Sequence, residues 1–277
     1  MASLAARRAK DTTIKAVSIG FAVFAIFLLG WILWTLLARG LPALGLNVFT
    51  NITMPPGQHG GLLNAIVGSL IQVGIAMLIG GPIGIFCGTF LAENGKKTKL
   101  GAAARFVNDI LLSAPSILVG LFIYSLLVVP FGGFSGWAGS VALAILVIPV
   151  VVRTTEDMLN LVPVGLREAA FALGAPQWKV VMFITWRAAR AGIVTGVLLA
   201  IARAAGETAP LLFTSLGNNA WSVDLNKPMA SLPIAIYQYA GSPFDDWVAL
   251  AWAGALLITV GVLLLNVVSR LVLARMH

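Results

Sequence analysis

Residues that form disulfides or hold metal ions are almost missing from this chain. It contains one cysteine, Cys87, and two histidines, His59 and His277, among 277 residues. A single cysteine excludes an intrachain disulfide scaffold, and two histidines so far apart provide no metal-ligand cluster. Charged residues are scarce as well, at 10% of the chain, compared with roughly 25% in soluble domains. This scarcity excludes an ordinary cytosolic globular enzyme.

Hydrophobic residues dominate the composition instead. They make up 59% of the sequence, and the mean hydropathy is +0.97. The 29 glycines and 13 prolines follow no repeat, so neither a collagen-like nor a disordered chain fits. We therefore predict an all-α integral membrane protein. The formal net charge of +8 then reports on the orientation of the chain in the membrane, whereas in a soluble protein it would suggest nucleic acid.

Six hydrophobic stretches are long enough, or nearly so, for membrane-spanning helices, which need roughly 20 mostly apolar residues. They are Ile14–Ala38, Leu62–Ala92, Phe106–Pro130, Phe134–Val152, Ala188–Phe213 and Trp247–Leu273. The first has too long an apolar core for a signal peptide and no A-x-A cleavage site after it, so we interpret it as a retained anchor. The chain is then a short cytoplasmic segment, residues 1–13, followed by a single transmembrane domain, residues 14–277.

The basic residues predict which side of the membrane each loop occupies, because cytoplasmic loops carry an excess of Lys and Arg. Of the 18 basic residues, 15 lie on one side of the predicted spans: Arg7, Arg8, Lys10, Lys15, Lys96, Lys97, Lys99, Arg105, Arg153, Arg167, Lys179, Arg187, Arg190, Arg270 and Arg275. The opposite side has only Arg39 and Lys227. Both termini are therefore predicted to be cytoplasmic.

The longest cytoplasmic segment, residues 153–190, is predicted to be structured. Pro163 and Gly165 interrupt the chain before residues 166–173, which are rich in strong helix formers, and Gly174 suits a helix C-terminus. Pro176 is tolerated in the first turn of a second helix. The segment therefore reads as two helices joined by a turn, lying across the membrane face.

A motif within this segment resembles the EAA loop, E-A-A-x3-G-x9-I-x-L-P, of importer-type ABC permeases. The matching residues are Glu168, Ala169, Ala170, Gly174 and Ile184, while Trp186 and Arg187 replace the final Leu and Pro. In that family the loop forms the coupling helices that dock into a groove on the ATPase subunit. The resemblance implies the same role here for Glu168, Ala169, Ala170 and Gly174. From the residues alone, a surface helix without a partner is the alternative.

The fifth predicted span contains two charged residues, Arg203 and Glu207, four residues apart and so expected on one helix face. Charges at mid-membrane are costly and normally face a protein interior or an aqueous path. Two interpretations follow from the residues. In the first, the two side chains neutralise each other as a purely structural pair. In the second, Arg203 binds a passing oxyanion through its planar guanidinium while Glu207 limits how tightly the anion is held.

Three segments resemble permeases of the phosphate-specific ABC importers. They are residues 203–212 (R-A-A-G-E-T-A-P-L-L), 113–122 (S-A-P-S-I-L-V-G-L-F) and 60–68 (G-G-L-L-N-A-I-V-G). The resemblance implies a six-helix type I ABC importer permease fold in a bacterial or archaeal cytoplasmic (inner) membrane. It also implies that Arg203 and Glu207 lie along the phosphate path.

The same resemblance implies the other components of the system. They are a related permease subunit, two ATPase subunits and an external phosphate-binding protein, with no nucleic acid. Residues Asn94–Thr98 lack the spacing of a nucleotide-binding loop, since Phe90 stands where the first glycine is required. ATP and Mg²⁺ are therefore expected on the partner ATPase, and this chain is expected to need no cofactor and to carry no catalytic residue. A permease for sulfate or molybdate, a passive anion channel and a polytopic membrane enzyme are the alternatives.

Two further features have local predictions. Arg105 and Asp109 have the spacing of an interfacial ion pair at the entrance of the third span. The outer segment 214–246 contains a short apolar stretch, residues 230–240, flanked by prolines. It fits either a re-entrant gate or an interfacial helix.

Overall fold

The computed structural model describes the backbone of residues 4–274. The side chains of Arg7, Arg8, Lys97, Arg270, Arg275 and His277 lie outside the described part. The helices are α1 (Leu4–Ala43), α2 (Asn47–Thr50), α3 (Leu63–Glu93), α4 (Lys99–Ser113), α5 (Ser116–Ile123), α6 (Gly136–Asn160), α7 (Val164–Ala172), α8 (Gln177–Lys179), α9 (Trp186–Ala205), α10 (Ala209–Thr214), α11 (Leu232–Ala240) and α12 (Asp245–Ala274). One 3-10 segment, η1 (Gly95–Lys97), and two π-helical segments, η2 (Tyr124–Val128) and η3 (Val180–Thr185), join them. Between residues 4 and 274 the chain has no strand, so the all-α prediction is confirmed.

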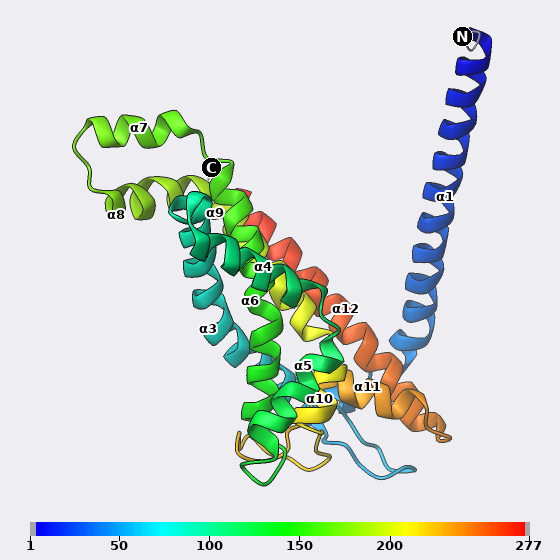
Figure 1. Ribbon diagram of the computed structural model, residues 1–277. Coiled ribbons are helices and arrows are strands. Elements are labelled where there is room, and N and C mark those ends of the chain that lie inside the picture. Colours follow the sequence, from blue (N-terminus) through cyan, green and yellow to red (C-terminus); the bar gives the residue numbers. More distant parts are fainter. Residues whose placement is uncertain (1–3, 275–277) are drawn as a thin grey trace.

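The structure has five or six candidate membrane spans, compared with the six predicted. Five helical stretches are long and apolar enough to cross a membrane: Lys10–Ala43, Leu63–Glu93, Gly136–Asn160, Gln177–Ala205 and Asp245–Val268. The pair Lys99–Ser113 and Ser116–Phe131 bends by 103° and is either a sixth, broken span or a re-entrant loop. In Figure 1 both ends of the chain lie on the same side as α7 and α8, opposite the loops that surround α10.

Helix α6 is the centre of the bundle, and glycines on α3 allow the two helices to approach closely. In α6, 72% of the most apolar window is buried, compared with 28% in α3. A Cβ at Gly84 would lie 2.6 Å from the Cβ of Val151, and one at Gly88 would lie 2.6 Å from the carbonyl oxygen of Val152. Small residues spaced by four are a common way for membrane helices to pack backbone against backbone.

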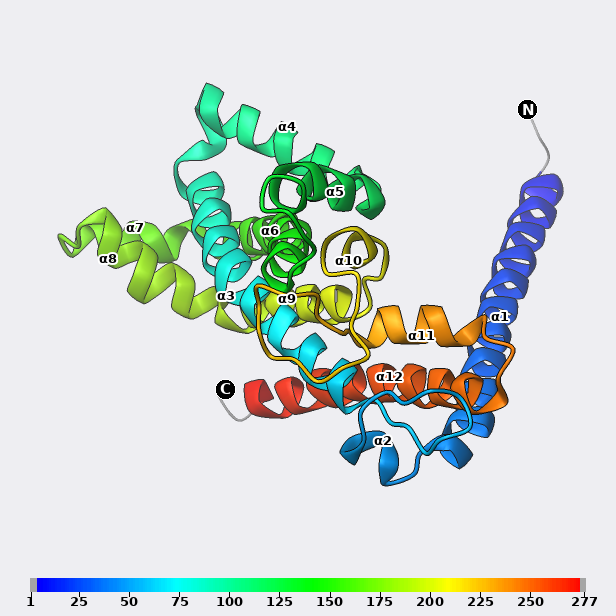
Figure 2. The same ribbon diagram turned by 90° about the horizontal axis from the view of Figure 1, so that it is seen from below.

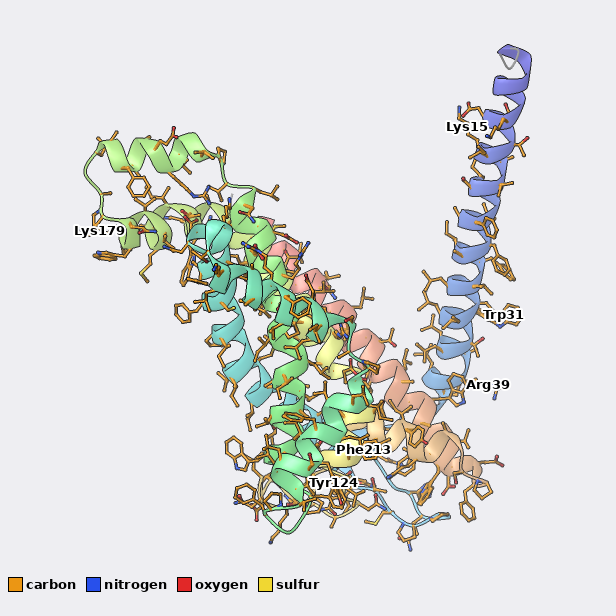
Figure 3. All side chains as sticks on the ribbon, viewed as in Figure 1. Lys15, Trp31, Arg39, Tyr124, Lys179 and Phe213 are labelled. Atoms are coloured by element: carbon orange, nitrogen blue, oxygen red, sulfur yellow. The ribbon has the colours of Figure 1, made fainter. Side chains whose placement is uncertain are left out.

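Helix α1 stands apart from this bundle. None of its most apolar window is buried, and its packing is confined to the end that meets α12, where Gly40 lies against Leu256. The Arg39 guanidinium lies 5.6 Å from the centre of the Trp252 ring at the same contact. Figure 3 shows Trp31 projecting away from the other helices, whereas Arg39 lies near the end of α1 that meets α12.

The third span differs from a single straight helix because Pro115 follows the end of α4. Proline restricts the preceding residue to extended conformations, and Ala114 has φ −66° and ψ 133°. The predicted ion pair between Arg105 and Asp109 is wrong. The Arg105 Nε donates instead to Glu156 Oε1 at 2.7 Å, and Asp109 lies 3.9 Å from Arg153. The pattern of i, i+4 charges missed Glu156 because that residue belongs to α6.

The outer segment 214–246 contributes a packed helix. One side of α11 is buried against α12 and α3, with Ile234 and Tyr239 almost fully enclosed. The Tyr239 hydroxyl donates to Thr53 Oγ1 at 3.0 Å, and Thr53 in turn donates to Asn64 Oδ1 at 3.3 Å. Burial raises the pKa of the Tyr239 hydroxyl above its usual range. Figure 2 shows α11 lying along α12.

Candidate substrate path and coupling loop

The charged pair of the fifth span lies at a break in the helix. Helix α9 ends at Ala205, and Gly206 is its C-cap residue. Pro210 follows in the first turn of α10, and a proline there would clash with the carbonyl of Gly206 if the helix continued. The expectation that Arg203 and Glu207 share one helix face is therefore wrong, because Glu207 lies beyond the end of α9.

The two side chains nevertheless meet. The Arg203 Nε lies 3.5 Å from Glu207 Oε1, a distance at the limit for a hydrogen bond. The Arg203 side chain is 43% exposed and that of Glu207 is 16% exposed. Within the described part of the chain, Glu207 is the one group bonded to this guanidinium. Both Nη nitrogens therefore remain available to a further acceptor.

Arg203 belongs to an open face of α9. Thr195, Leu199 and Arg203 follow one another at intervals of four residues, and all are exposed. Leu199, one turn before the arginine, is 57% exposed. An arginine inside a hydrophobic span requires a protein surface or a water-filled cavity beside it. This face of α9 is therefore a candidate for one side of a site.

The second broken span packs directly against this break. A Cβ at Gly120 of α5 would lie 2.7 Å from the Cα of Pro210, so the backbones of α5 and α10 are in contact. Figure 2 shows these two short helices next to each other. Two of the segments that suggested the permease family, residues 113–122 and 203–212, thus meet in space. The third, residues 60–68, lies elsewhere: Asn64 Nδ2 donates to the carbonyl oxygen of Asn218 at 2.9 Å.

The predicted coupling residues lie in the loop formed by α7 and α8. Helix α7 contains Glu168, Ala169 and Ala170, of which the first two are exposed and Ala170 is buried. Gly174 ends the helix with φ +78°, a conformation that favours glycine. Its N–H donates to the Phe171 carbonyl at 2.9 Å, and the N–H of the next residue donates to Ala170 at 3.2 Å. These two bonds form a Schellman motif, so the spacing from Ala170 to Gly174 is that of a helix end.

Both helices adjoining this loop are longer than the predicted spans. Helix α6 continues to Asn160, and the helical stretch that includes α9 begins at Gln177. The segment 153–190 therefore contains two helix ends as well as α7. In Figure 1 the loop lies far from α10, so the predicted coupling residues and the charged pair are not brought together. The predicted coupling residues come just before the start of the helical stretch 177–205, and the charged pair lies at its end.

An arginine that the motif does not include holds the loop in place. The Arg167 Nη2 donates to Glu93 Oε1 at 2.9 Å and to the Leu159 carbonyl at 2.7 Å, while Nη1 donates to the Val162 carbonyl at 2.8 Å. Arg167 is 13% exposed and Glu93 is 12% exposed. This single side chain thus joins α7 to the ends of α6 and α3. Sequence reasoning missed it because 74 positions separate the two partners.

The C-terminal end of α3 also accepts hydrogen bonds from an arginine of α4. Arg105 of α4 donates to the Leu91 carbonyl at 2.8 Å and to the Gly95 carbonyl at 3.3 Å, in addition to its bond with Glu156. Cations near a helix C-terminus are favourable because its last carbonyls carry partial negative charge. Two arginines, one from the coupling loop and one from the bent span, therefore fix the same helix end.

The Schellman motif predicts opposite effects at two glycines of this loop. Gly174→Ala is expected to destabilise the loop by about 1–2 kcal/mol, since a Cβ is unfavourable at positive φ. Gly165→Ala, within α7 and with open space around it, is expected to be neutral or slightly stabilising because alanine favours helices. The measurement is the rate of trypsin cleavage after Lys179, which should rise only for Gly174→Ala. Equal rates for the two variants would contradict this account of the helix end.

Comparison with known proteins identifies the family. Residues 80–277 match the family described as binding-protein-dependent transport system inner membrane component. The phosphate transport system permease protein PstA of Pasteurella multocida is 57% identical over 265 residues, covering 96% of this chain and 95% of that protein. PstA of Haemophilus influenzae is 59% identical over 249 residues, covering 90% of this chain and 88% of that protein.

A more distant relative and a solved structure agree with these matches. PstA 1 of Mycobacterium tuberculosis is 35% identical over 272 residues, covering 96% of this chain and 89% of that protein. The fold is similar to a chain of the inward-facing MetNI methionine ABC transporter, with a TM-score of 0.62, 19% identity, and coverage of 78% of this chain and 94% of that chain. This multi-pass membrane chain belongs to the PstA permeases, within the family of binding-protein-dependent transport system inner membrane components.

Proposed function

We propose that this chain is a permease subunit of an ATP-driven importer of inorganic phosphate, working by alternating access. The observation that carries the proposal is the arginine on the open face of α9. Arg203 lies in a hydrophobic span, is 43% exposed and has one weak contact with Glu207. A charge so arranged is costly unless it serves a ligand or a partner. The names of the PstA relatives identify phosphate as the ligand class.

The chemistry of the pair suits phosphate. The guanidinium offers a planar pair of donors to an oxyanion. Near neutral pH inorganic phosphate still carries a P–OH group. This group can donate a hydrogen bond to the Glu207 carboxylate, since an ionised carboxylate is a hydrogen-bond acceptor only. Sulfate has no such proton and would meet the carboxylate as a like charge. With no anion present, Glu207 partly neutralises Arg203, which limits how tightly the anion is held.

The proposed function requires partner subunits. A related permease subunit completes the site by covering the open face of α9. Two ATPase subunits bind ATP and Mg²⁺ and dock on α7, through Glu168, Ala169, Ala170 and the turn at Gly174, and an external phosphate-binding protein delivers the substrate. The termini and the coupling loop then face the cytoplasm, with the chain in a bacterial or archaeal inner membrane. This subunit performs no covalent chemistry and binds no nucleic acid.

The test is ATP-dependent uptake of labelled phosphate by the reconstituted complex, with sulfate or molybdate added in excess. We expect uptake that requires ATP and is little affected by either competitor. Strong competition by sulfate or molybdate would reassign the substrate to another oxyanion while leaving the permease assignment in place. Uptake that proceeds without the ATPase subunits would instead indicate a passive anion channel.

A further inference from the structure

The helical stretch that connects the coupling loop to the charged pair contains a π-helical turn. This turn, η3 (Val180–Thr185), lies between α8 and α9. The Trp186 N–H donates to the Val181 carbonyl, five residues back. The Thr185 hydroxyl likewise donates to the Val180 carbonyl at 3.2 Å. A π turn contains one more residue than an α turn and is frequent at functional sites.

The burial of this segment depends on the π turn. Val180 is 1% exposed and Thr185 is 0% exposed, although they lie five residues apart. In an α-helix, residues five apart differ in direction by about 140°, so these two side chains could not both face the bundle. Trp178 and Phe183 are also five apart, and both are exposed, with their ring centres 6.4 Å from each other.

The sequence of the segment also fits an α-helix. The residues that would then share one face, at spacings of three and four, are Trp178, Val181, Met182 and Thr185. In the structure Trp178 is 56% exposed and Met182 is 49% exposed. Together with Val181 they line a groove of about 480 Å³ beside the end of α3. An apolar α-helical face is therefore written in the sequence but is not buried in this register.

Two consecutive valines allow an exchange between the two registers. With Thr185 facing the bundle, the π turn places Val180 in the interior, whereas an α turn would place Val181 there, four residues before Thr185. The same type of side chain then fills the interior position in both registers. The segment is therefore suited to a shift of one residue.

Contacts beyond η3 confine such a shift to the residues before Trp186. The indole Nε1 of Trp186 donates to Thr89 Oγ1 of α3 at 3.0 Å. A Cβ at Gly196 would lie 2.6 Å from the Cβ of Thr154, so α9 also packs closely on α6. In the other direction, η3 leads through α8 to the turn at Gly174 and to α7. Movement of α7 therefore reaches η3 before it reaches α9.

We propose that η3 changes from the π to the α register when an ATPase subunit displaces the coupling loop. The change rotates α8 by roughly 100° relative to α9 and shifts it by about 1.5 Å along the helix axis. Val181 replaces Val180 in the interior, and Trp178 and Met182 turn towards the bundle. The loop movement thereby becomes a defined step of one residue. This inference rests on the proposed function, in which ATPase subunits dock on α7.

Cysteine labelling of the assembled complex in nanodiscs tests the exchange. Val180→Cys and Val181→Cys are made separately in a Cys87→Ala chain, since Cys87 is the one native cysteine. A water-soluble maleimide is added with or without Mg²⁺ and a non-hydrolysable ATP analogue. Without nucleotide, we expect the Val181→Cys chain to react and the Val180→Cys chain to be protected. With nucleotide, the Val180→Cys chain should react at least about tenfold faster and the Val181→Cys chain should become protected, since a minor conformation is populated at about 10% or less.

Replacing Thr185 tests the hydrogen bond that supports the π register. Thr185→Val removes the hydroxyl and keeps a β-branched side chain, so labelling of the Val180→Cys chain without nucleotide should rise roughly fivefold. Thr259→Val is the matched control, because the Thr259 hydroxyl donates to the Ala255 carbonyl at 2.8 Å in an ordinary turn of α12. Labelling should be unchanged in this control.

Reciprocal labelling of the two positions is the result that supports the switch. Labelling that does not respond to nucleotide would overturn it. So would labelling that falls at both positions, which would mean that the ATPase covers the helix. Because labelling does not measure transport, the two proposals fail separately. ATP-dependent phosphate uptake without reciprocal labelling contradicts the switch alone, and reciprocal labelling without uptake contradicts the importer alone.

Discussion

Replacing Arg203 by glutamine is expected to reduce phosphate uptake by the assembled complex roughly 10- to 150-fold. Each hydrogen bond between an ionised donor and an acceptor contributes about 1.5–3 kcal/mol, and tenfold in rate corresponds to about 1.4 kcal/mol. Glutamine keeps a polar side chain of similar length but removes the positive charge and the planar fork. Because the side chain is 43% exposed and lies on an open helix face, its loss leaves the packing of this subunit intact.

Two controls separate a role in the path from a general effect of charge. Arg203→Lys keeps the charge without the fork, so we expect partial uptake. Arg39→Gln removes an arginine whose contact is the ring of Trp252, and uptake should be unchanged. The measurement is initial uptake at matched amounts of assembled complex. Normal uptake by Arg203→Gln would make Arg203 a counter-ion of Glu207 and nothing more.

The span pattern was predictable from the sequence because membrane helices must satisfy their backbone internally. An uninterrupted hydrophobic run such as Leu62–Ala92 leaves little choice but a helix, and the structure has Leu63–Glu93. Helix breaks were harder to predict. Prolines also lie within α3 at Pro82 and within α6 at Pro149, where the helices continue. A break at Pro210 depends on its combination with Gly206 and on the packing of α5, which hydropathy does not report.

Contacts between distant segments were not predictable from spacing. Charges four residues apart suggested a bond between Arg105 and Asp109, yet Glu156 lies closer to Arg105 in the folded chain. The end of α7 was predicted correctly from the helix formers at residues 166–173 and the glycine that follows them, because a helix C-terminus is set by local backbone geometry. The EAA resemblance contained no information about Glu93, which meets the loop only once α3 and α6 have packed.

The contact between Arg167 and Glu93 leads to the second large prediction. Arg167→Gln is expected to destabilise the complex by about 1.5–3 kcal/mol, since it leaves a part-buried carboxylate without its charged partner. The effect on transport should exceed the effect on ATP hydrolysis. Arg167 joins the coupling loop to the ends of α3 and α6, so a motion received at α7 would no longer reach the spans. We expect fewer phosphate ions transported per ATP hydrolysed.

Two further variants distinguish the ion pair from the loss of one large side chain. Glu93→Gln combined with Arg167→Gln leaves no unpaired charge, so its stability should recover most of the loss seen with Arg167→Gln alone. Arg153→Gln is the matched control, because Arg153 is 53% exposed and exposed pairs contribute about 0–1 kcal/mol. Thermal unfolding of the complex gives the stabilities, and uptake and ATP hydrolysis measured on the same preparation give the coupling ratio. If the double variant regains stability but not the ratio, the contacts of Arg167 themselves, with Glu93 and with the carbonyls of Leu159 and Val162, transmit the motion between the coupling loop and the spans. If it regains both, the pair serves only to neutralise charge, and none of the Arg167 contacts transmits the motion.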